Sequence, residues 1–318
     1  MENNNESSSP HVIKHLVLAG GGIIGYKTFG ILRESEKAGF WNIRNIQSIY
    51  GTSIGGMMAV MIALKFDWDV LDDFIIKRPW HHVFKFDMNN IFLSFHTKGI
   101  LDIHVIEQFY EPLFKAKDLD IKITMKELYE FNGIEIHLFS TEFNETIPVD
   151  ISWKTHPDWT VIESVYCSCC LPFLFSPYFK DEKIYYDGGV FCNYPLLQCC
   201  KNLEEKGDGG LINTNEILGI KTMIQQDPPF NEKSTLFDYI THLMKKFIHS
   251  SNEKIKKKEI LIQNEVVIDS VNVSLYDIYL AVSNMDIRIQ LIEDGVKIWK
   301  TFLETLFTHN PSGKMESS

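Results

Sequence analysis

A serine at position 53 lies between two glycines in the pentapeptide Gly51-Thr52-Ser53-Ile54-Gly55. Residues 46–50 before it are rich in β-favouring side chains, and residues 57–64 after it are good helix formers without a breaker. This context predicts that Ser53 lies on a sharp turn between a buried strand and a helix, with its hydroxyl projecting above a sheet. Gly51 and Gly55 leave room for a carbonyl group, and the helix N-terminus favours developing negative charge. The chemistry that this arrangement favours is acyl transfer.

A nucleophilic serine needs a base that takes its proton. In the α/β-hydrolase arrangement the serine is followed by an acid and then a histidine, and several strands precede it. Ser53 follows only the second expected strand, which favours a dyad in which an aspartate acts directly. Asp187 ends a short strand expected at 183–186, and Gly188 and Gly189 let the chain turn away. A second Asp-Gly-Gly begins at Asp208 but follows a polar stretch and no strand, so we interpret it as a solvated turn.

A glycine-rich loop lies between the first expected strand, 15–19, and a helix expected at 26–38. Gly20, Gly22 and Gly25 fit the Gly-x-Gly-x-x-Gly pattern of dinucleotide-binding proteins, which also needs an acidic residue at the end of the second strand. That strand ends without Asp or Glu, so the nucleotide interpretation fails. Consecutive glycines at a helix N-terminus also point backbone N–H groups at one spot, and we therefore expect an oxyanion hole here.

Composition limits the partners of this chain. Of its 318 residues 45% are hydrophobic and 23% charged, as in soluble globular proteins. The net charge of −11 argues against nucleic-acid binding, because a phosphate backbone would be repelled, and it requires any membrane contact to come from a local patch.

Residues 45–64 are uncharged and long enough to span a bilayer, but three glycines favour a buried strand, turn and helix. Residues 1–10 lack the apolar core of a signal peptide, so we expect a cytoplasmic protein that attaches peripherally to membranes.

The sequence does not favour a metal or another cofactor. Six cysteines lie in two groups, at 167–170 and 192–200, and we expect reduced, buried thiols rather than a zinc site. His81, His82 and His96 lack a ligand-like spacing with a carboxylate. We interpret them as partly buried surface residues.

These residues must be positioned by an α/β fold. Further strands are expected at 134–140, 146–153 and 217–224, the last being the final core strand, and further helices at 67–77, 99–115, 161–170 and 194–201. Residues 171–179, with two prolines, are expected to form a loop or sheet edge near the pocket. Residues 234–307 are expected to be mostly helical, interrupted near 266–273. The predicted organisation is a disordered arm at 1–13, a catalytic domain at 14–225, a helical portion packed on the same domain at 226–307, and a disordered tail at 308–318.

The motifs occur in an order that resembles the patatin-like phospholipases. The shared stretches are the glycine loop at 20–25, the pentapeptide at 51–55, Asp187-Gly188-Gly189, residues 99–102, 141–144 and 168–177, and Asn193 with Pro195. The resemblance implies a three-layer α/β/α sandwich, a Ser–Asp dyad without a catalytic histidine, no required metal, and hydrolysis of acyl esters in lipids. It implies that Ser53 is the nucleophile and Asp187 the base. The backbone amides of Gly21, Gly22 and Ile23 would then stabilise the oxyanion.

One departure from the family pattern leaves alternatives open. The family usually has Arg or Lys before the last glycine of the loop, where this chain has Ile24. The leading hypothesis is a phospholipase A or lysophospholipase that acts at a membrane surface. The alternatives are a neutral-lipid lipase or acyltransferase, and a catalytically weak or silent lipid-binding protein. Five apolar residues have three alternative roles in these hypotheses: they line the acyl-chain site, touch the bilayer or belong to the core. They are Phe92, Phe95, Phe173, Leu174 and Phe175.

Overall fold

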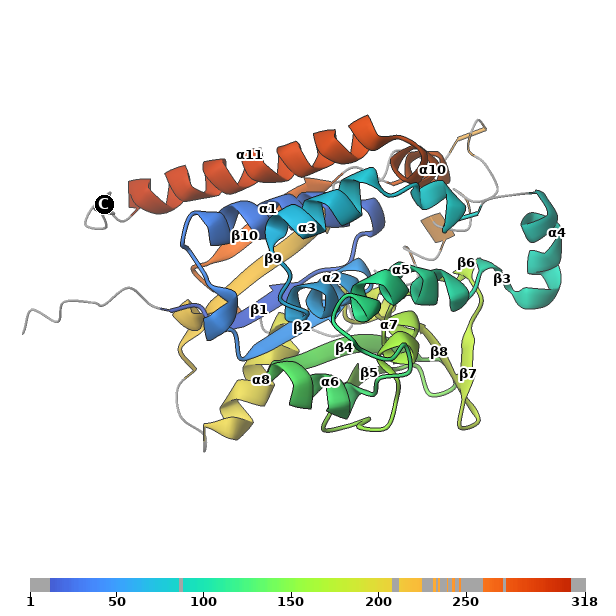
Figure 1. Cartoon of the computed structure of the whole chain (residues 1–318), viewed down its shortest axis with the longest axis horizontal. Coiled ribbons are helices and arrows are strands. Elements are labelled where there is room, and N and C mark those ends of the chain that lie inside the picture. Colours follow the sequence, from blue (N-terminus) through green and yellow to red (C-terminus); the bar gives the residue numbers. More distant parts are fainter. Residues whose placement is uncertain are drawn as a thin grey trace, which may run out of the picture.

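A mixed eight-stranded sheet forms the centre of the protein (Figure 1). The computed structural model describes residues 12–85, 88–207, 212–224, 260–270 and 273–309, and the separate positions 231, 232, 234, 239, 242, 243 and 246. The strand order is β10-β9-β1-β2-β4-β8-β7, and β5 also pairs with β4. The strands are β1 His15–Leu18, β2 Ser48–Thr52, β4 Glu135–Glu142, β5 Ile147–Ile151, β7 Tyr178–Lys180, β8 Lys183–Asp187, β9 Ile217–Ile224 and β10 Glu265–Ser270.

The sheet is parallel from β10 to β4 and antiparallel beyond, at β5, β8 and β7. A separate two-stranded parallel ladder joins β3 Gly99–Leu101 to β6 Phe173–Phe175. The helices are α1 Gly25–Lys37, α2 Ile54–Ala63, α3 Trp68–Asp72 with a π-helical turn at Asp73–Lys77, α4 Met88–Thr97, α5 His104–Lys115, α6 Met125–Asn132, α7 Val161–Cys169, α8 Leu196–Lys206, α10 Leu275–Ser283 and α11 Met285–His309.

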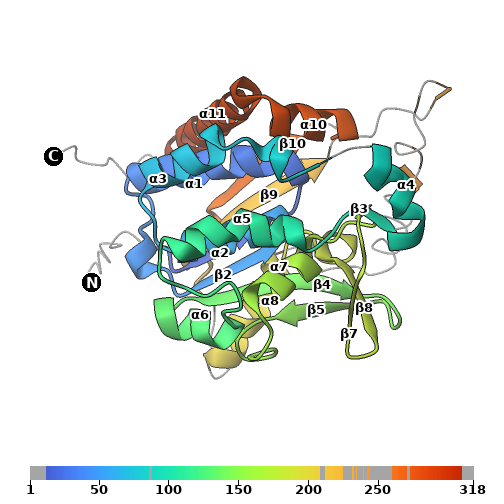
Figure 2. The ribbon, with the colours of Figure 1, turned by 45° about the vertical axis from the view of Figure 1, so that its right-hand side comes forward.

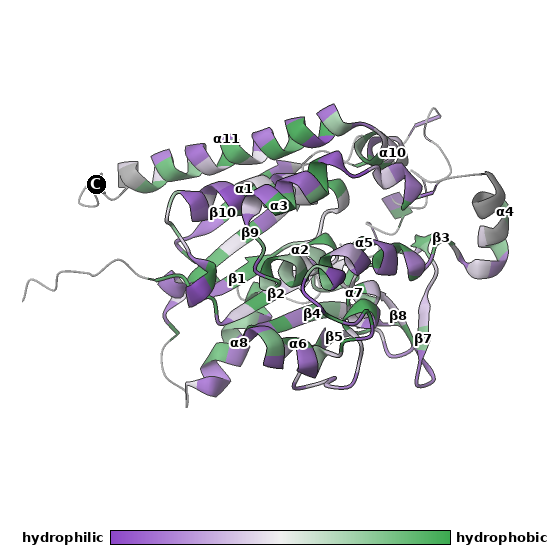
Figure 3. Cartoon of the chain, viewed as in Figure 1, coloured by the Kyte–Doolittle hydropathy of each residue, from purple (hydrophilic) through white to green (hydrophobic). Residues whose placement is uncertain are grey.

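Helices cover both faces of the sheet, which gives the expected three layers (Figure 2). Leu16, Leu18 and Ile49 point to the face that packs against α1, α2, α5, α7 and α11. Val17 and Tyr50, which alternate with them, point to the other face, where α8 supplies Leu196, Cys199 and Cys200. Because both faces are buried, apolar side chains of β1 and β2 point to both sides of the sheet. The outermost helix, α11, instead alternates between hydrophobic and hydrophilic residues along its length (Figure 3).

The sequence locates most of these elements but misses the strands β3 and β10. Residues 217–224 are predicted to be the last core strand, but β10 pairs with this strand and extends the sheet by one more. β10 lies in the region that the sequence predicts only as an interruption between helices. Residues 99–102 were expected to start a helix, but 99–101 form β3 and the helix begins at His104. The segment 171–179 does lie at an edge, where it forms β6 and β7. The predicted arm at 1–11, the tail at 310–318 and much of 226–259 fall outside the described residues.

Capping boxes fix the start of three helices. Thr124 and Glu127 at α6, Thr160 and Glu163 at α7, and Ser274 and Asp277 at α10 exchange side-chain and backbone hydrogen bonds. Each pair satisfies two N–H groups that a helix end leaves without partners. Among the described residues, no helix is both long enough and apolar enough to cross a bilayer.

Candidate active site

Ser53 lies on a strained turn between β2 and α2. Its backbone angles, φ 54° and ψ −125°, are uncommon for a residue with a Cβ atom. A Cβ at Gly51 would overlap the carbonyl of Gly55, and a Cβ at Gly55 would overlap the carbonyl of Leu18, so both glycines are needed for this close approach. The predicted strand–turn–helix is therefore confirmed, with the helix beginning at Ile54.

Ser168, on α7, holds this turn in place. Its hydroxyl accepts a hydrogen bond from the Ser53 backbone N–H at 2.9 Å and donates one to the carbonyl of Phe139 at 2.7 Å. Ser168 is fully buried, so the bond is shielded from water. Sequence reasoning had placed Ser168 in a shared stretch without giving it a role, because its partners lie far away along the chain.

Asp187 ends β8 and meets the serine. Its carboxylate accepts the Gly189 N–H at 2.7 Å and lies near enough to the Ser53 side chain for that hydroxyl to lower its pKa. Asp187 is only 4% exposed, and burial raises its pKa to about 6 although both of these groups act in the opposite direction. Gly188 follows in a turn where a Cβ would overlap the Phe139 carbonyl. The structure thus brings together the two side chains that the sequence predicted as a dyad.

The glycine loop lies directly against the serine. A Cβ at Gly20 would come within 3.2 Å of the Ser53 Cβ atom. The Gly20 N–H donates to the Asn193 carbonyl at 3.0 Å, and the Gly25 N–H bonds within the loop, to Gly22 and Ile23. In the described part of the chain the N–H groups of Gly21 and Gly22 donate to no protein acceptor. Of the predicted loop residues, Gly20 and Gly25 therefore shape the loop, and the amides of its middle are free for a ligand.

Two hydrogen bonds fasten the aspartate loop to the serine turn and the glycine loop. The Thr52 hydroxyl donates to the Cys192 carbonyl at 2.7 Å, and the Asn193 side-chain amide, which lies between Gly20 and Gly189, donates to the Gly20 carbonyl at 3.4 Å. Asn193 was recognised only as a shared residue, and no local pattern indicated that it connects the two loops.

Ile24 replaces the family's usual basic residue and is buried. It is 6% exposed, belongs to the main apolar core, and donates its backbone N–H to the Gly21 carbonyl at 3.1 Å. Apolar packing and this backbone bond therefore anchor the loop.

The six cysteines are free thiols and all are buried, as predicted. Cys169 lies beside the dyad, and burial raises the pKa of its thiol well above the ordinary value. The thiol is therefore neutral at physiological pH and places no charge next to Asp187. Within the described ranges, no three His, Cys, Asp or Glu side chains gather as metal ligands. The alternative base Asp208 lies outside the described residues.

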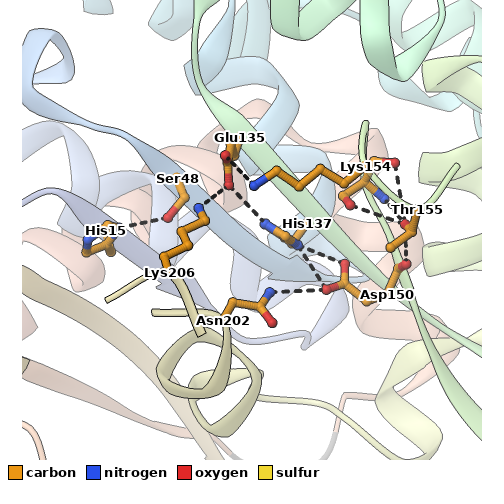
Figure 4. A network of polar contacts seen from close by, with 10 residues as sticks. His15, Ser48, Glu135, His137, Asp150, Lys154, Thr155, Asn202 and Lys206 are labelled. Carbon is orange, nitrogen blue, oxygen red and sulfur yellow. Dashed lines mark hydrogen bonds and ion pairs between the residues drawn. The ribbon is translucent and has the colours of Figure 1, made fainter. Parts of the chain in front are cut away.

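A second polar cluster lies at the amino ends of the strands, away from the dyad (Figure 4). Ser48 and His15 pair there at 2.7 Å, which resembles a nucleophile with its base. Both side chains are at most 5% exposed, so no substrate can reach them. A hollow of about 520 Å³ opens beside this cluster, lined in part by Lys14, Gln47 and Lys206. It lies at the opposite end of the strands from Ser53 and is not an acyl site.

Fold and sequence together define the class of protein. Residues 16–199 match the family model described as patatin-like phospholipase, and the chain belongs to this family of lipid hydrolases. It is 24% identical over 319 residues to the uncharacterized protein R571 of Acanthamoeba polyphaga mimivirus, covering 97% of this chain and all of that one. It is 23% identical to the probable lipid hydrolase 463L of invertebrate iridescent virus 6, covering 60% of this chain and 64% of that one. Among solved structures it is similar to VipD from Legionella pneumophila, with a TM-score of 0.48 and 17% identity over 90% of this chain and 67% of that one.

Proposed function

We propose that the protein is a phospholipase A or lysophospholipase that cleaves fatty-acyl esters through a Ser53 acyl-enzyme. The observation that carries this proposal is the placement of Ser53, on a strained turn, beside the buried Asp187 carboxylate and against the glycine loop. The name of the iridescent-virus relative, a probable lipid hydrolase, agrees with it.

The reaction follows from the geometry in two steps. Ser53 Oγ attacks the ester carbonyl carbon while Asp187 takes the hydroxyl proton, and the tetrahedral oxyanion accepts hydrogen bonds from the free amides of the glycine loop. The protonated Asp187 then gives its proton to the departing alcohol oxygen as the ester bond breaks. In the second step Asp187 takes a proton from water, the hydroxide oxygen attacks the acyl-enzyme, and the proton returns to Ser53 as the fatty acid leaves.

We also propose where this chemistry occurs. The six unpaired thiols fit a reducing compartment, so we assign the activity to the cytoplasm, with transient attachment to a membrane surface that supplies phospholipid. We further propose that residues 14–307 form one catalytic unit, because α11 packs on α1, which begins at the glycine loop.

The decisive experiment measures fatty-acid release from mixed phospholipid vesicles by wild type, Ser53→Ala and Asp187→Asn. Release by wild type, with both variants near background, is the expected result. Covalent labelling by an organophosphonate distinguishes the alternatives. A protein that labels at Ser53 but releases no fatty acid from phospholipid has another acyl-ester substrate, such as a neutral lipid. A protein that neither releases nor labels is a silent lipid-binding protein, and that outcome overturns the proposal.

A further inference from the structure

Four exposed phenylalanines gather at one end of the protein, on α4, β6 and β7. Phe92 and Phe95 on α4 are 66% and 83% exposed, Phe173 on β6 is 48% exposed, and Phe179 on β7 is 60% exposed. We call these four residues the aromatic patch. Single exposed apolar side chains are normal on a protein surface, but a group on neighbouring elements indicates an interaction site.

The elements that carry the aromatic patch are joined to one another. Helix α4 packs on β3, and β3 pairs with β6 in a register that places Gly99 opposite Phe173. Lys98, between α4 and β3, lies with its ammonium 6.0 Å from the centre of the Phe179 ring, which connects β7 to the same group. In Figures 1 and 2, α4 projects from the layered body beside β3.

Backbone strain holds part of this surface in place. Phe173 has φ 68° and Lys98 has φ 65°, in the left-handed region that bulky residues rarely adopt. The strain at Phe173 displays a large apolar side chain to solvent, whereas its neighbours Leu174 and Phe175 are buried at 7% exposure. Strain of this kind persists where the surrounding structure imposes it, and it is concentrated at functional positions.

The aromatic patch is also tied to the dyad by a short piece of chain. Cys169 lies beside Ser53 and Asp187, and the Cys170 carbonyl accepts the Asp187 N–H at 3.1 Å. Phe173 follows Cys170 by three residues, so a surface that binds the aromatic patch is brought next to the Ser53 site.

The chemistry of this surface favours a lipid bilayer as its partner. Aromatic rings combined with a long basic side chain suit the boundary between head groups and acyl chains, where rings insert and the ammonium meets phosphate. The surface is not polybasic, because the turn after β7 carries Asp181 and Glu182, and the whole chain has a net charge of −11. We propose that the aromatic patch docks on zwitterionic phospholipid and presents the Ser53 site to it, an inference that rests on the proposed function.

Binding to vesicles tests the proposal without requiring catalysis. All proteins carry Ser53→Ala, and the vesicles are phosphatidylcholine alone. The double variant Phe92→Ser/Phe95→Ser is expected to sediment with vesicles about tenfold less than its parent, because it loses two rings that would be withdrawn from water. Phe131→Ser is the matched control, since Phe131 is also 48% exposed but lies at the end of α6, outside the patch. Equal loss in both variants, or none in either, overturns the proposal.

The salt dependence separates apolar docking from charge attraction. Binding through inserted rings persists at about 0.5 M salt, where the Debye length falls to a few ångströms, whereas binding through charges is lost. A probe attached at Phe95→Cys adds a direct readout, because the six native thiols are buried and do not compete for label. A polarity-sensitive fluorophore there is expected to shift to the blue on vesicles, and one at Phe131→Cys to remain unchanged. The opposite pattern contradicts the proposal.

Activity then distinguishes this proposal from the proposed function. With Ser53 restored, the double phenylalanine variant is expected to hydrolyse a soluble short-chain ester at the wild-type rate and phospholipid vesicles about tenfold more slowly. If wild type binds vesicles through the aromatic patch but hydrolyses neither substrate, the proposed function is wrong. The proposal that the aromatic patch is a docking surface is then still supported. If the double variant instead changes the oligomeric state and not vesicle binding, the patch joins two copies of the chain and the docking proposal is wrong.

Discussion

Burial gives Asp187 a different acid–base character from the other carboxylates near it. Glu163 is also partly buried, but hydrogen bonds from Tyr178, Lys180 and Thr160 outweigh desolvation and lower its pKa to about 2. For Asp187 no described cation offsets desolvation, which dominates and raises its pKa to about 6. A carboxylate with this pKa is still ionised at neutral pH and is a stronger base than an exposed aspartate.

This environment predicts the pH dependence of the site. Because Asp187 must be ionised to accept the serine proton, the rate of organophosphonate labelling of Ser53 is expected to rise with pH, reach half its maximum near pH 6 and then level off. The measurement is the labelling rate between pH 4.5 and 8.5 on protein shown to stay folded throughout. A midpoint near pH 4 would show that the Asp187 carboxylate is solvated. A midpoint near pH 7 that disappears when a histidine is substituted would show that this histidine, and not Asp187, is the base.

Ser168 is predicted to matter for reactivity more than for stability. In Ser168→Ala the Ser53 N–H loses its acceptor inside the protein, at a cost of roughly 1–3 kcal/mol, and the strained turn loses its anchor. We expect organophosphonate labelling to slow by about tenfold or more, in line with loss of a positioning contact.

The control is Ser164→Ala on the same helix. Ser164 is equally buried but donates to Thr160 and touches no part of the serine turn. It is expected to lose comparable stability in chemical denaturation and keep the wild-type labelling rate. Equal labelling in the two variants contradicts the role of Ser168.

The two residues of the proposed dyad can be selected from the sequence because their signals are local. Gly51, Ser53 and Gly55 occur within five residues, and Asp187 comes directly after a recognisable short strand. The contacts of Ser168 and Asn193 could not be predicted in this way. Each depends on which segments the fold places side by side, and neither residue differs locally from an ordinary helix or loop residue.

At the scale of elements, the strands that the sequence predicts are those whose side-chain pattern indicates burial. Strands β1, β2 and β4 are almost entirely buried, and each has apolar side chains at its centre. β10 has charged residues at Glu265 and Asp269, as an edge strand does, so its pattern resembles a loop between helices. β3 and β6 have three residues each and are strands only because they pair with one another.

Helix α8, which follows the aspartate loop, is fastened to the sheet by the polar cluster in Figure 4. Lys206 pairs with Glu135, and Asn202 contacts Asp150 at 3.4 Å. His137 lies between the two carboxylates, 2.9 Å from Asp150 and 3.7 Å from Glu135, and stacks on Tyr50. Burial alone would lower the His137 pKa, but the hydrogen bond to Asp150 and the negative charge of Glu135 nearby outweigh it and raise the pKa.

His137→Gln is predicted to change how stability depends on pH. A raised folded-state pKa means that charged His137 stabilises the protein fully below about pH 6.5, and that this contribution is lost as pH rises through the folded-state pKa. We expect wild type to exceed the variant by roughly 2 kcal/mol in free energy of unfolding near pH 6, with the difference shrinking at alkaline pH. Chemical denaturation at several pH values measures it.

His15→Gln is the matched control for this prediction. Burial lowers the His15 pKa to about 4, so His15 is neutral across the same range. Its substitution is expected to cost the same stability from pH 6 to pH 9. A His137→Gln difference that likewise stays constant with pH would mean that His137 is uncharged and acts by packing.

At the scale of the whole molecule, the crossing of α1 and α11 joins the two ends of the described chain. Gly30 on α1 lies against the backbone of Ile292 on α11, and Gly295 on α11 lies against the backbone of Lys27 on α1. A Cβ at either glycine would overlap the facing backbone, so the helices approach as closely as glycine permits. Trp299 adds a fully buried side chain that packs on Phe40.

Gly295→Ala is therefore predicted to destabilise the entire protein by about 2 kcal/mol or more, because the added methyl group separates the helices. Glu293→Ala, an exposed neighbour on the same helix, is the control and is expected to have little effect. Denaturation followed by both far-ultraviolet circular dichroism and tryptophan fluorescence should give one shared transition, shifted only in Gly295→Ala. Two separate transitions would show that α11 belongs to an independent unit.

The packing of α11 on α1 also determines when the site can assemble during translation. The glycine loop and Ser53 leave the ribosome early, but β1 has β9 as one neighbour, and α1 rests on a helix that begins at Met285. Contacts this distant in sequence form late, since the intervening chain must first be made and its loops closed. A nascent chain therefore carries the reactive serine and its glycine loop without the support that aligns them. The proposed lipolytic activity is therefore expected to be withheld during translation, until α11 has docked on α1.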